Sequence, residues 1–322
     1  MERFGSNIVC ACLCLGLALA AQGGLAQTKP IRVIVPATPG GLLDGSVRRL
    51  APRMSEVLGQ PVVVENRAGA GGIIGMAEVA RSLPDGQTLL YFNDAVALIP
   101  FVFKNPGFDT LKDFSPITQT VSAPFGLFVH PSVPANTLRE LVAFSKAKSG
   151  KLNGSSGGAG TASHLFFEAF KSASGTDMQH IPYKSASQVL TDFIAGQIQV
   201  FAISTTLAGP QVRAGKAKAL AVATGRRVAL LPDVPTFAEA GYPGMEYTTW
   251  LGFFGPGNMA GATTQRIYEA ASKALNDPAN LKAFTDQGLD VLGSTPADFR
   301  RFVASENAKF GKAAAAAGIT PE

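Results

Sequence analysis

The sequence predicts an α/β protein of two lobes, each built on a mostly parallel sheet flanked by helices. Short apolar stretches alternate with amphipathic ones in two separate series, which is typical of parallel strands joined by right-handed crossovers. The 322 residues are enough for two domains of roughly 100–200 residues each. The chain ends in helical patterns alone, and such helices can pack back on the first lobe.

The first series has the order β-α-β-α-β. Strands are rich in Val, Ile and Leu, whereas apolar residues recur at helical spacing in the segments between them. The turn signal Pro84-Asp85-Gly86 precedes the third strand. The expected elements are a strand at 31–36, a helix at 43–58, a strand at 61–65, a helix at 72–81 and a strand at 88–92.

The second series begins after Pro124. Its expected strands are 125–130, 152–156, 179–182, 198–203 and 218–224, and its expected helices are 137–148, 161–172 and 188–195. The chain then ends in three expected helices at 263–276, 278–287 and 296–317. Thr295-Pro296 followed by Asp298 is a typical start for the last of them.

The composition is that of a globular protein whose charge is not clustered. Hydrophobic residues make up 46% of the chain, charged residues 16%, and the formal net charge is +5. No run of Lys or Arg is longer than two. Because nucleic-acid-binding proteins gather basic side chains on one face, we expect no nucleic-acid partner. A mild positive field still favours anionic ligands.

Residues 1–26 have the features of a secretory signal peptide. Arg3 precedes an apolar run at 8–21, and the small residues at 24–26 suit a cleavage site. The run is shorter than the ~20 apolar residues that a membrane-spanning helix needs. All three cysteines lie within this segment, so the mature chain would have neither disulfides nor thiolate ligands. Acylation of one of these cysteines is left open as an alternative.

Three glycine-rich loops share one arrangement, because each follows a strand and precedes a helix. They are residues 36–44, residues 66–75 (NRAGAGGIIG) and residues 155–164 (SSGGAGTASH). Glycine lets backbone N–H groups point outward, and a helix N-terminus adds unpaired donors and a partial positive charge, so such a loop can bind a carboxylate or a phosphate. One loop alone is equally well a tight turn. Three loops in two lobes predict a cleft with an anion-binding rim on each side.

Other uses of these loops find no support in the sequence. Residues 69–75 lack the G-x-G-x-x-G spacing of dinucleotide folds, and no Gly-Lys-Ser/Thr follows any of the loops. The sequence contains no H-E-x-x-H motif, and its three histidines are spread far apart along the chain. We therefore expect no cofactor, no metal site and no enzymatic activity. A secreted enzyme acting on carboxylates is kept as the less favoured alternative.

Seven motifs occur in order along the mature chain. They are TKPIRVIVP at 28–36, GQPVVVENRAGAGGIIG at 59–75, PDGQTLL at 84–90, GTASHL at 160–165, HIPYK at 180–184, RAGKAKALAV at 213–222 and LPDVPTFAEAGYPG at 231–244. Together they resemble the periplasmic solute receptors of tripartite tricarboxylate transporters, often called Bug receptors. The resemblance covers essentially the whole mature chain.

The resemblance implies a two-lobed clamshell of the type II periplasmic binding protein kind. Lobe 1 would comprise residues 27–124 plus 250–322, and lobe 2 residues 125–249. It also implies a monomeric receptor in the periplasm that binds a small mono- or dicarboxylate, carries out no chemistry and delivers the ligand to membrane permease subunits. A receptor that presents its ligand to a membrane signalling protein would have the same fold, so this alternative stays open.

Carried over by position, the resemblance places the ligand against all three glycine loops. The implied ligand-binding residues are Thr38, Gly40, Gly41, Asp44, Gly69, Ala70, Gly71, Gly72, Gly160, Thr161, Ser163 and His164. Tyr183 is a further candidate, as an apolar wall of the site, although core packing is the more common role of an aromatic side chain. Asp44 would repel a ligand carboxylate at close range. The sequence leaves open whether it orients waters at the ligand or caps the helix that follows.

Departures from the family pattern indicate the kind of ligand. The first loop is more apolar and stiffer than usual, with Ala37, Pro39, Leu42 and Leu43. The segment GQIQVFAISTT lacks the acidic residues that many family members carry there and that could pair with an amino group. We therefore expect a carboxylate with a neutral or apolar body, aromatic acids included, rather than an amino acid.

Overall fold

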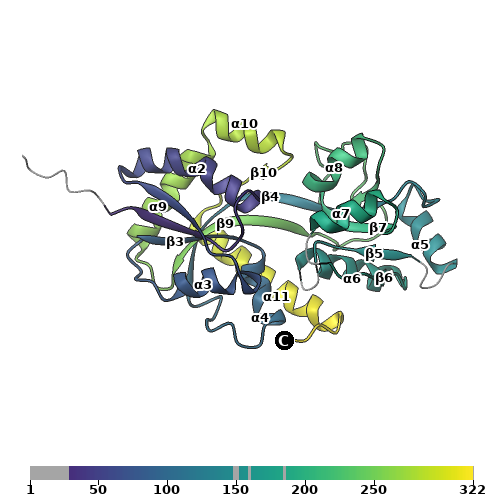
Figure 1. Cartoon of the computed structure of the whole chain (residues 1–322), viewed down its shortest axis with the longest axis horizontal. Coiled ribbons are helices and arrows are strands. Elements are labelled where there is room, and N and C mark those ends of the chain that lie inside the picture. The colour runs from purple at the N-terminus through teal and green to yellow at the C-terminus, as the bar shows by residue number, and fades with distance from the viewer. Residues whose placement is uncertain (1–28, 148–151, 159–160, 184–185, 322) are drawn as a thin grey trace, which may run out of the picture.

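The computed structural model describes residues 29–147, 152–158, 161–183 and 186–321, so the predicted signal peptide lies outside the described residues (Figure 1). The strands are β1 (Ile31–Val35), β2 (Val62–Asn66), β3 (Thr88–Asn93), β4 (Phe114–Val129), β5 (Asn153–Ser155), β6 (Gln179–His180), β7 (Val200–Ser204), β8 (Lys218–Val222), β9 (Thr248–Pro256) and β10 (Asp290–Val291). The helices are α2 (Leu42–Leu58), the 3₁₀ turn η1 (Ala70–Gly72), α3 (Ile73–Ala80), α4 (Ala95–Val102), α5 (Leu138–Ala147), α6 (Ala162–Ser174), α7 (Ala186–Ile194), α8 (Thr205–Arg213), α9 (Gly261–Leu275), α10 (Pro278–Asp286) and α11 (Pro296–Ala316).

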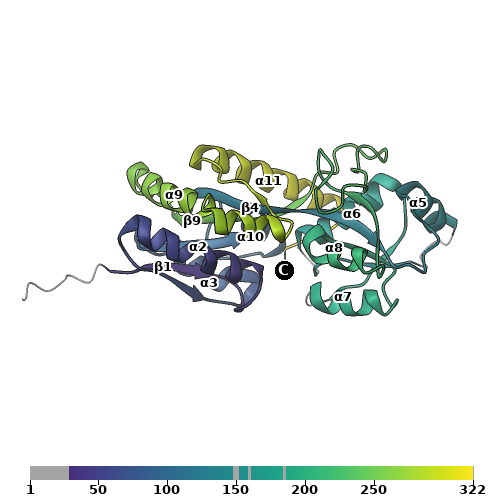
Figure 2. The ribbon, with the colours of Figure 1, turned by 90° about the horizontal axis from the view of Figure 1, so that it is seen from above.

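Two lobes lie end to end along the long axis of the molecule, and strand β4 runs from one into the other (Figures 1 and 2). All 16 residues of β4 are buried. From Phe114 to Pro124 the strand pairs with β9, and from Phe125 onward it pairs with β7 and β8. The change of partners thus falls between Pro124 and Phe125, and the lobe bounds of 27–124 plus 250–322 and of 125–249 stay a prediction.

The strand order is β2-β1-β3-β9-β4-β7-β5-β6, with β8 and β10 also paired to β4. Strands β1, β2 and β3 run parallel in the first lobe, and β5, β6 and β7 run parallel in the second. The long strands β4 and β9 are antiparallel to each other and to their further neighbours. The predicted α/β fold with two sheet-based lobes is thus confirmed, and two antiparallel strands join its parallel parts.

The first half of β4 was not predicted because its sequence is polar. Thr118, Gln119 and Thr120 are buried, and both threonine hydroxyls have hydrogen-bond partners on another strand or loop. The Thr120 hydroxyl donates to the carbonyl of Leu251 at 3.0 Å, and the Thr118 hydroxyl donates to that of Ser294 at 2.8 Å. Buried hydroxyls are tolerated when they are hydrogen-bonded in this way, and a hydropathy pattern does not show it.

Helices α4 and α8 were also missed, and each contains an internal proline, Pro100 and Pro210. Proline normally argues against a helix interior, since it removes one backbone hydrogen bond. Both helices are short and are held against the sheet by packing. Within the described ranges, no helix combines the length and the hydrophobicity needed to cross a membrane.

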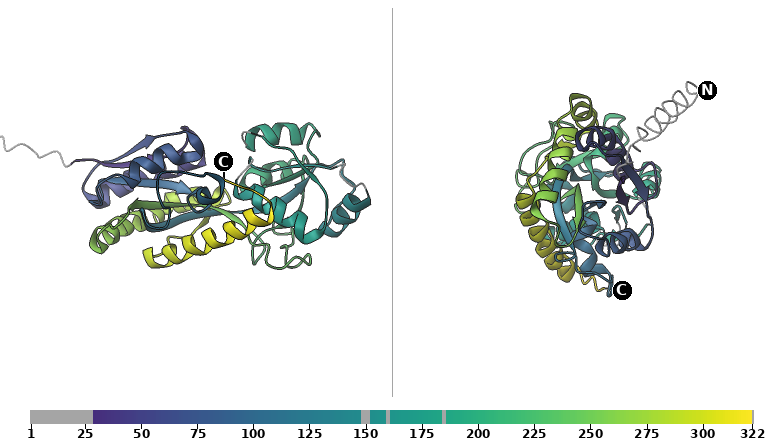
Figure 3. Two further views of the ribbon diagram at one scale, coloured as in Figure 1. Left: turned by 90° about the horizontal axis from the view of Figure 1, so that it is seen from below. Right: turned by 90° about the vertical axis from the view of Figure 1, so that its left-hand side faces the viewer.

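The C-terminal helices do pack back on the first lobe, and α11 also reaches the second (Figure 3). Phe299 of α11 is fully buried, with its ring 5.5 Å from that of Trp250 and 5.0 Å from that of Phe254. The Trp250 indole donates to Glu306 at 3.2 Å. These contacts fix α11 to β9, so its far end has a defined position beside α6.

Phe299→Ala should lower the free energy of unfolding by about 3–5 kcal/mol, because it leaves a cavity under α11. Urea unfolding monitored by circular dichroism measures the loss. Leu83→Ala is the control, since the Leu83 side chain is 73% exposed. Its effect should stay within about 0.5 kcal/mol. Equal effects of the two substitutions would contradict the packing role of Phe299.

Candidate functional site

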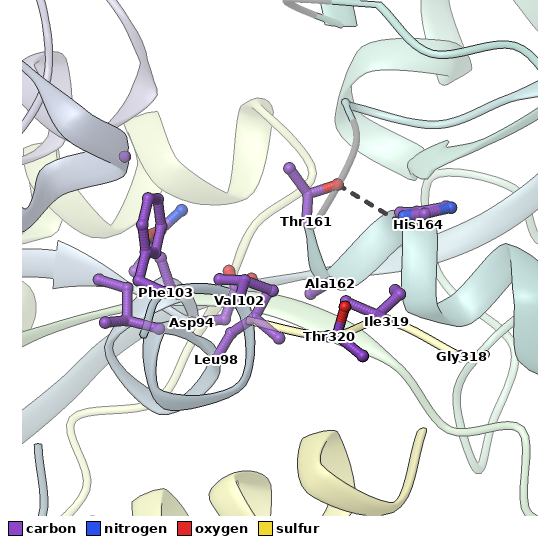
Figure 4. Close-up of a pocket in the computed structure, with 14 residues that line it drawn as sticks. Asp94, Leu98, Val102, Phe103, Thr161, Ala162, His164, Gly318, Ile319 and Thr320 are labelled. Carbon is purple, nitrogen blue, oxygen red and sulfur yellow. Dashed lines mark hydrogen bonds between the residues drawn. The ribbon is translucent and has the colours of Figure 1, made fainter. Parts of the chain in front are cut away.

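A cavity of about 530 Å³ lies where the two lobes meet (Figure 4). Lobe 1 contributes the glycine turn η1, the residues after β3 and one face of α4, and lobe 2 contributes the first turn of α6. The segment that follows α11 supplies a third wall. The lining residues are Gly71, Asn93, Asp94, Ala95, Leu98, Ile99, Val102, Phe103, Thr161, Ala162, His164, Gly318, Ile319 and Thr320.

The lobe 2 wall is the N-terminus of α6, which its own loop shapes. Thr161 is the N-cap, and its hydroxyl accepts from the His164 backbone N–H at 3.4 Å and donates to the Gly158 carbonyl at 2.7 Å. The Ser163 hydroxyl accepts from the Gly157 N–H at 2.8 Å. The preorganised helix start at the cavity therefore offers a partial positive charge to an anion.

Two histidines form a stacked pair at this wall. The rings of His164 and His180 lie 4.0 Å apart between centroids at an angle of 26°. Burial lowers the pKa of His164, and burial together with the neighbouring His164 lowers the pKa of His180 to about 4. The pair is therefore uncharged at neutral pH. His164 can take part in hydrogen bonding at the cavity without adding a full charge.

The second glycine loop can only be built with small residues. Gly69, Ala70, Gly71 and Gly72 have φ values of 136°, 46°, 63° and 105°, all in the region that favours glycine. A Cβ on Gly72 would lie 2.3 Å from the Phe92 ring. The loop is thus packed against the core, and it carries Gly71 into the cavity wall.

Asp94 lies on the lobe 1 side of the cavity and is only 5% exposed. Its Oδ1 accepts from the Thr249 hydroxyl at 2.5 Å. Burial raises the pKa of Asp94 to about 6, although the hydrogen bond from Thr249 acts in the opposite direction. Asp94 therefore connects the cavity wall to β9, the strand that pairs with β4 up to the lobe boundary.

The first glycine loop is held by Asp44 at a separate place. The buried Asp44 carboxylate accepts from the Gly40 N–H at 2.9 Å, from Arg48 at 2.8 Å and from Asn66 at 3.0 Å. Burial alone would raise the pKa of Asp44, but these donors hold it below its usual range. Gly40 and Gly41 line a second cavity of about 370 Å³, which is closed on its other side by α10 and the residue after it.

Comparison with known proteins identifies the class to which this two-lobed chain belongs. The sequence profile of the tripartite tricarboxylate transporter family receptor matches residues 46–319. The chain belongs to this family. The resemblance to Bug receptors is thus confirmed, and the family consists of periplasmic binding receptors rather than enzymes.

Solved structures of this receptor family are similar over nearly the whole chain. The periplasmic binding protein BugD is 32% identical with a TM-score of 0.78, covering 91% of this chain and 99% of BugD. A protein of R. palustris, solved with adipate, is 29% identical with a TM-score of 0.81, covering 92% of this chain and 100% of that protein. MatC from Rhodopseudomonas palustris with bound malate is 28% identical with a TM-score of 0.75, covering 88% and 98%.

The structure brings together only part of the predicted receptor site. Gly71, Thr161 and His164 line the larger cavity, and Gly40 and Gly41 line the smaller one. The predicted residues that line neither cavity are Thr38, Asp44, Gly69, Ala70, Gly72, Ser163 and Tyr183. Gly160 lies outside the described residues. The binding roles of all these residues remain predictions.

Tyr183 was expected as an apolar wall of the site, but its hydroxyl has a local partner. It donates to Asp192 at 2.6 Å, and this hydrogen bond is the main reason that the pKa of Tyr183 is raised to about 12. The contact joins the segment after β6 to α7. It gives Tyr183 a structural role in lobe 2, whether or not a ligand also touches the ring.

Two parts of the receptor cavity were missed by the sequence analysis. One is the turn after β3 with helix α4, where the apolar run AVALIPFV was a usable signal. The other is the segment 318–320, where glycine after an alanine-rich helix signals a helix end but not the cavity that follows. Neither stretch has the glycine-rich pattern that was used to find the loops.

Gly72→Ala is expected to destabilise the receptor by about 2–4 kcal/mol, because the new Cβ overlaps Phe92 and the backbone becomes strained. Urea unfolding measures the change. Gly45→Ala in α2 is the matched control, since nothing lies within 4 Å of a Cβ placed there. The control should be neutral or slightly stabilised, and a Gly72→Ala protein as stable as the control would contradict the packing argument.

The raised pKa of Asp94 predicts a pH-dependent stability. The folded protein holds this proton up to about pH 6, whereas the unfolded chain releases it near the ordinary value of 3.8. The stabilisation is therefore complete below about pH 4 and is lost as the pH rises to about 6. Asp94→Asn should remove this component of the melting-temperature profile between pH 4 and 6.5.

The exposed substitution Asp233→Asn serves as the control for this pH profile, and it should keep the wild-type dependence. Melting temperatures of the three proteins, measured in one series of buffers, make the comparison. Parallel profiles for Asp94→Asn and the wild type would contradict a buried proton on Asp94.

Proposed function

We propose that this chain is a periplasmic receptor that captures a small organic carboxylate between its lobes and delivers it to a tripartite tricarboxylate-type membrane transporter. The observation that carries the proposal is the cavity of about 530 Å³ with walls from both lobes. The relatives with adipate and with bound malate support a carboxylate as ligand.

The lining of this cavity suits an anion that is held by dipoles. The N-terminus of α6 and the glycine turn η1 face it from opposite lobes, and Thr161 and Asn93 add polar side chains. The nearest histidine, His164, is neutral at pH 7. Recognition therefore depends on backbone donors and a helix dipole, which is the usual way to bind a carboxylate at a helix start.

The two-sided lining also supports a clamshell mechanism. A ligand that contacts α4 and α6 together binds the closed arrangement better than the open one, so binding shifts the population toward closure. A membrane permease that recognises the closed arrangement would then distinguish loaded from empty receptor. Export by the signal peptide at 1–26 places the receptor in the periplasm, where such a permease is accessible.

The lining favours a ligand without an amino group. Among the lining residues that the structure describes, Asp94 alone has a carboxyl group, and this carboxyl accepts a hydrogen bond from Thr249. Leu98, Ile99 and Val102 instead present an apolar surface. This agrees with the ligand class inferred from the first loop, a carboxylate with a neutral or apolar body.

A thermal-shift screen followed by calorimetry tests the proposal on purified mature protein. Succinate, adipate, malate, hexanoate and benzoate form one group, and aspartate and glutamate form the other. At 100 times its Kd, a ligand adds about 2.7 kcal/mol of stability, which raises the melting temperature by several degrees. At least one acid of the first group should do so. Tight binding of aspartate or glutamate alone would contradict the ligand class.

Thr161→Val should weaken binding of that acid about tenfold, because the substitution removes a polar group at the cavity. Thr137→Val is the matched control. Thr137 likewise accepts a backbone N–H at the start of a helix, from Glu140 at 3.2 Å, but it lies away from the cavity. Equal affinities in the two variants would argue against binding at the start of α6.

A further inference from the structure

The segment 318–320 enters the cavity because α11 ends in a Schellman motif. Gly318 has φ of +66°, its N–H donates to the Ala315 carbonyl at 3.2 Å, and the Ile319 N–H donates to the Ala314 carbonyl at 3.0 Å. These are the two backbone hydrogen bonds that define the motif. The chain therefore leaves the helix in one direction, which is fixed by local geometry.

That direction brings Ile319 to the cavity wall. The side chain packs against the large hydrophobic core cluster and lines the cavity together with Leu98 and Val102 of α4. In Figure 4, Ile319 lies beside Ala162 and below His164, next to Thr320. It is the apolar side chain that the post-helix segment adds to the lining, between Gly318 and Thr320.

Helix α11 is held in place by contacts with β9 and with Tyr247. Trp250 and Phe299 fix it to β9, as described above. Further along, Lys309 lies over the Tyr247 ring at 4.8 Å and contacts Glu306, which receives the Trp250 indole N–H. A helix anchored in this way holds Ile319 at a set distance from α4, so the apolar part of the cavity has a limited length.

The cavity lining combines polar and apolar groups. Polar groups come from Asn93, Asp94, Thr161, His164 and Thr320, and an apolar surface comes from Leu98, Ile99, Val102 and Ile319. A ligand whose carboxylate binds at the start of α6 would place its apolar body against this surface. Burial of each methylene there is favourable until the wall is reached, and beyond that length the ligand would clash.

We propose that Ile319 is a specificity-determining residue that sets the length of the apolar body of the bound carboxylate. This inference rests on the proposed function, since it presumes that an organic acid occupies the cavity. It assigns a role to a residue outside all three glycine loops. The ligand class that follows is a straight-chain or aromatic acid whose body ends at the segment after α11.

The test is isothermal titration calorimetry with butyrate, hexanoate, octanoate and decanoate on the wild type, Ile319→Ala and Ile319→Trp. The wild type should prefer one chain length. Ile319→Ala should move the preference to a longer acid and change the ratio of affinities about tenfold, the usual effect of one or two methylenes in an apolar pocket. Ile319→Trp should move it to a shorter acid.

Leu83→Ala, which alters an exposed leucine away from the cavity, is the matched control and should keep the wild-type order of affinities. Circular dichroism confirms that each variant is folded. If the wild type and both Ile319 variants bind these acids in the same order, Ile319 does not set the length, and the proposed function still stands. If the wild type binds none of these acids but binds a short hydroxy dicarboxylate, the inference on Ile319 again fails alone. If it binds no organic acid at all, the proposed function fails as well.

Discussion

The architecture depends on one strand that belongs to two sheets. Strand β4 is buried along its whole length, and it exchanges β9 for β7 and β8 between Pro124 and Phe125. Because backbone hydrogen bonds continue on both sides of this point, the lobes are connected by a sheet and not by a free linker. The relative placement of α4 and α6, and hence the cavity between them, follows from the geometry of this shared strand.

Hydrogen bonding of buried polar groups is the second requirement of this arrangement. The first half of β4, which pairs with β9, is buried and yet contains Thr118, Gln119 and Thr120 in place of aliphatic residues. Thr120 lies within hydrogen-bond distance of Tyr91 at 2.9 Å and donates to the Leu251 carbonyl. Such polar pairs specify register, because a shift by one residue would leave several buried groups without partners.

The sequence correctly predicted those elements that are determined by interactions between neighbouring residues. The parallel units, the helices with good caps and the glycine loops all have short-range signals, and the structure contains them. The features that were not predicted depend on contacts between residues that are far apart in the sequence. The polar half of β4 is a strand only because β9 returns from more than 120 positions later to pair with it. The cavity wall at Ile319 depends on where α11 is anchored, which no neighbouring residue determines.

The prediction of the site from the glycine loops was limited in the same way. Their pattern correctly indicated backbone donors near the ends of strands, and Gly71 and Thr161 do reach one cavity. It could not show that Asp44 and Ser163 use their polar atoms to shape their own loops. A motif gives the residue types that can bind an anion, whereas the direction of each group is fixed by contacts made after folding.

The position of β9 between β3 and β4 has a consequence for the order in which the protein can fold. Strands β5 to β8 all lie within residues 153–222, so the second lobe can pair them as soon as β4 is present. The first lobe has no such continuity, since β3 and β4 have no common neighbour until residues 248–256 are available. Until then both strands have an unpaired edge, which is a template for association with other chains. The N-terminal half of the chain is therefore the part that most needs protection from association before β9 is available, although it is synthesised first.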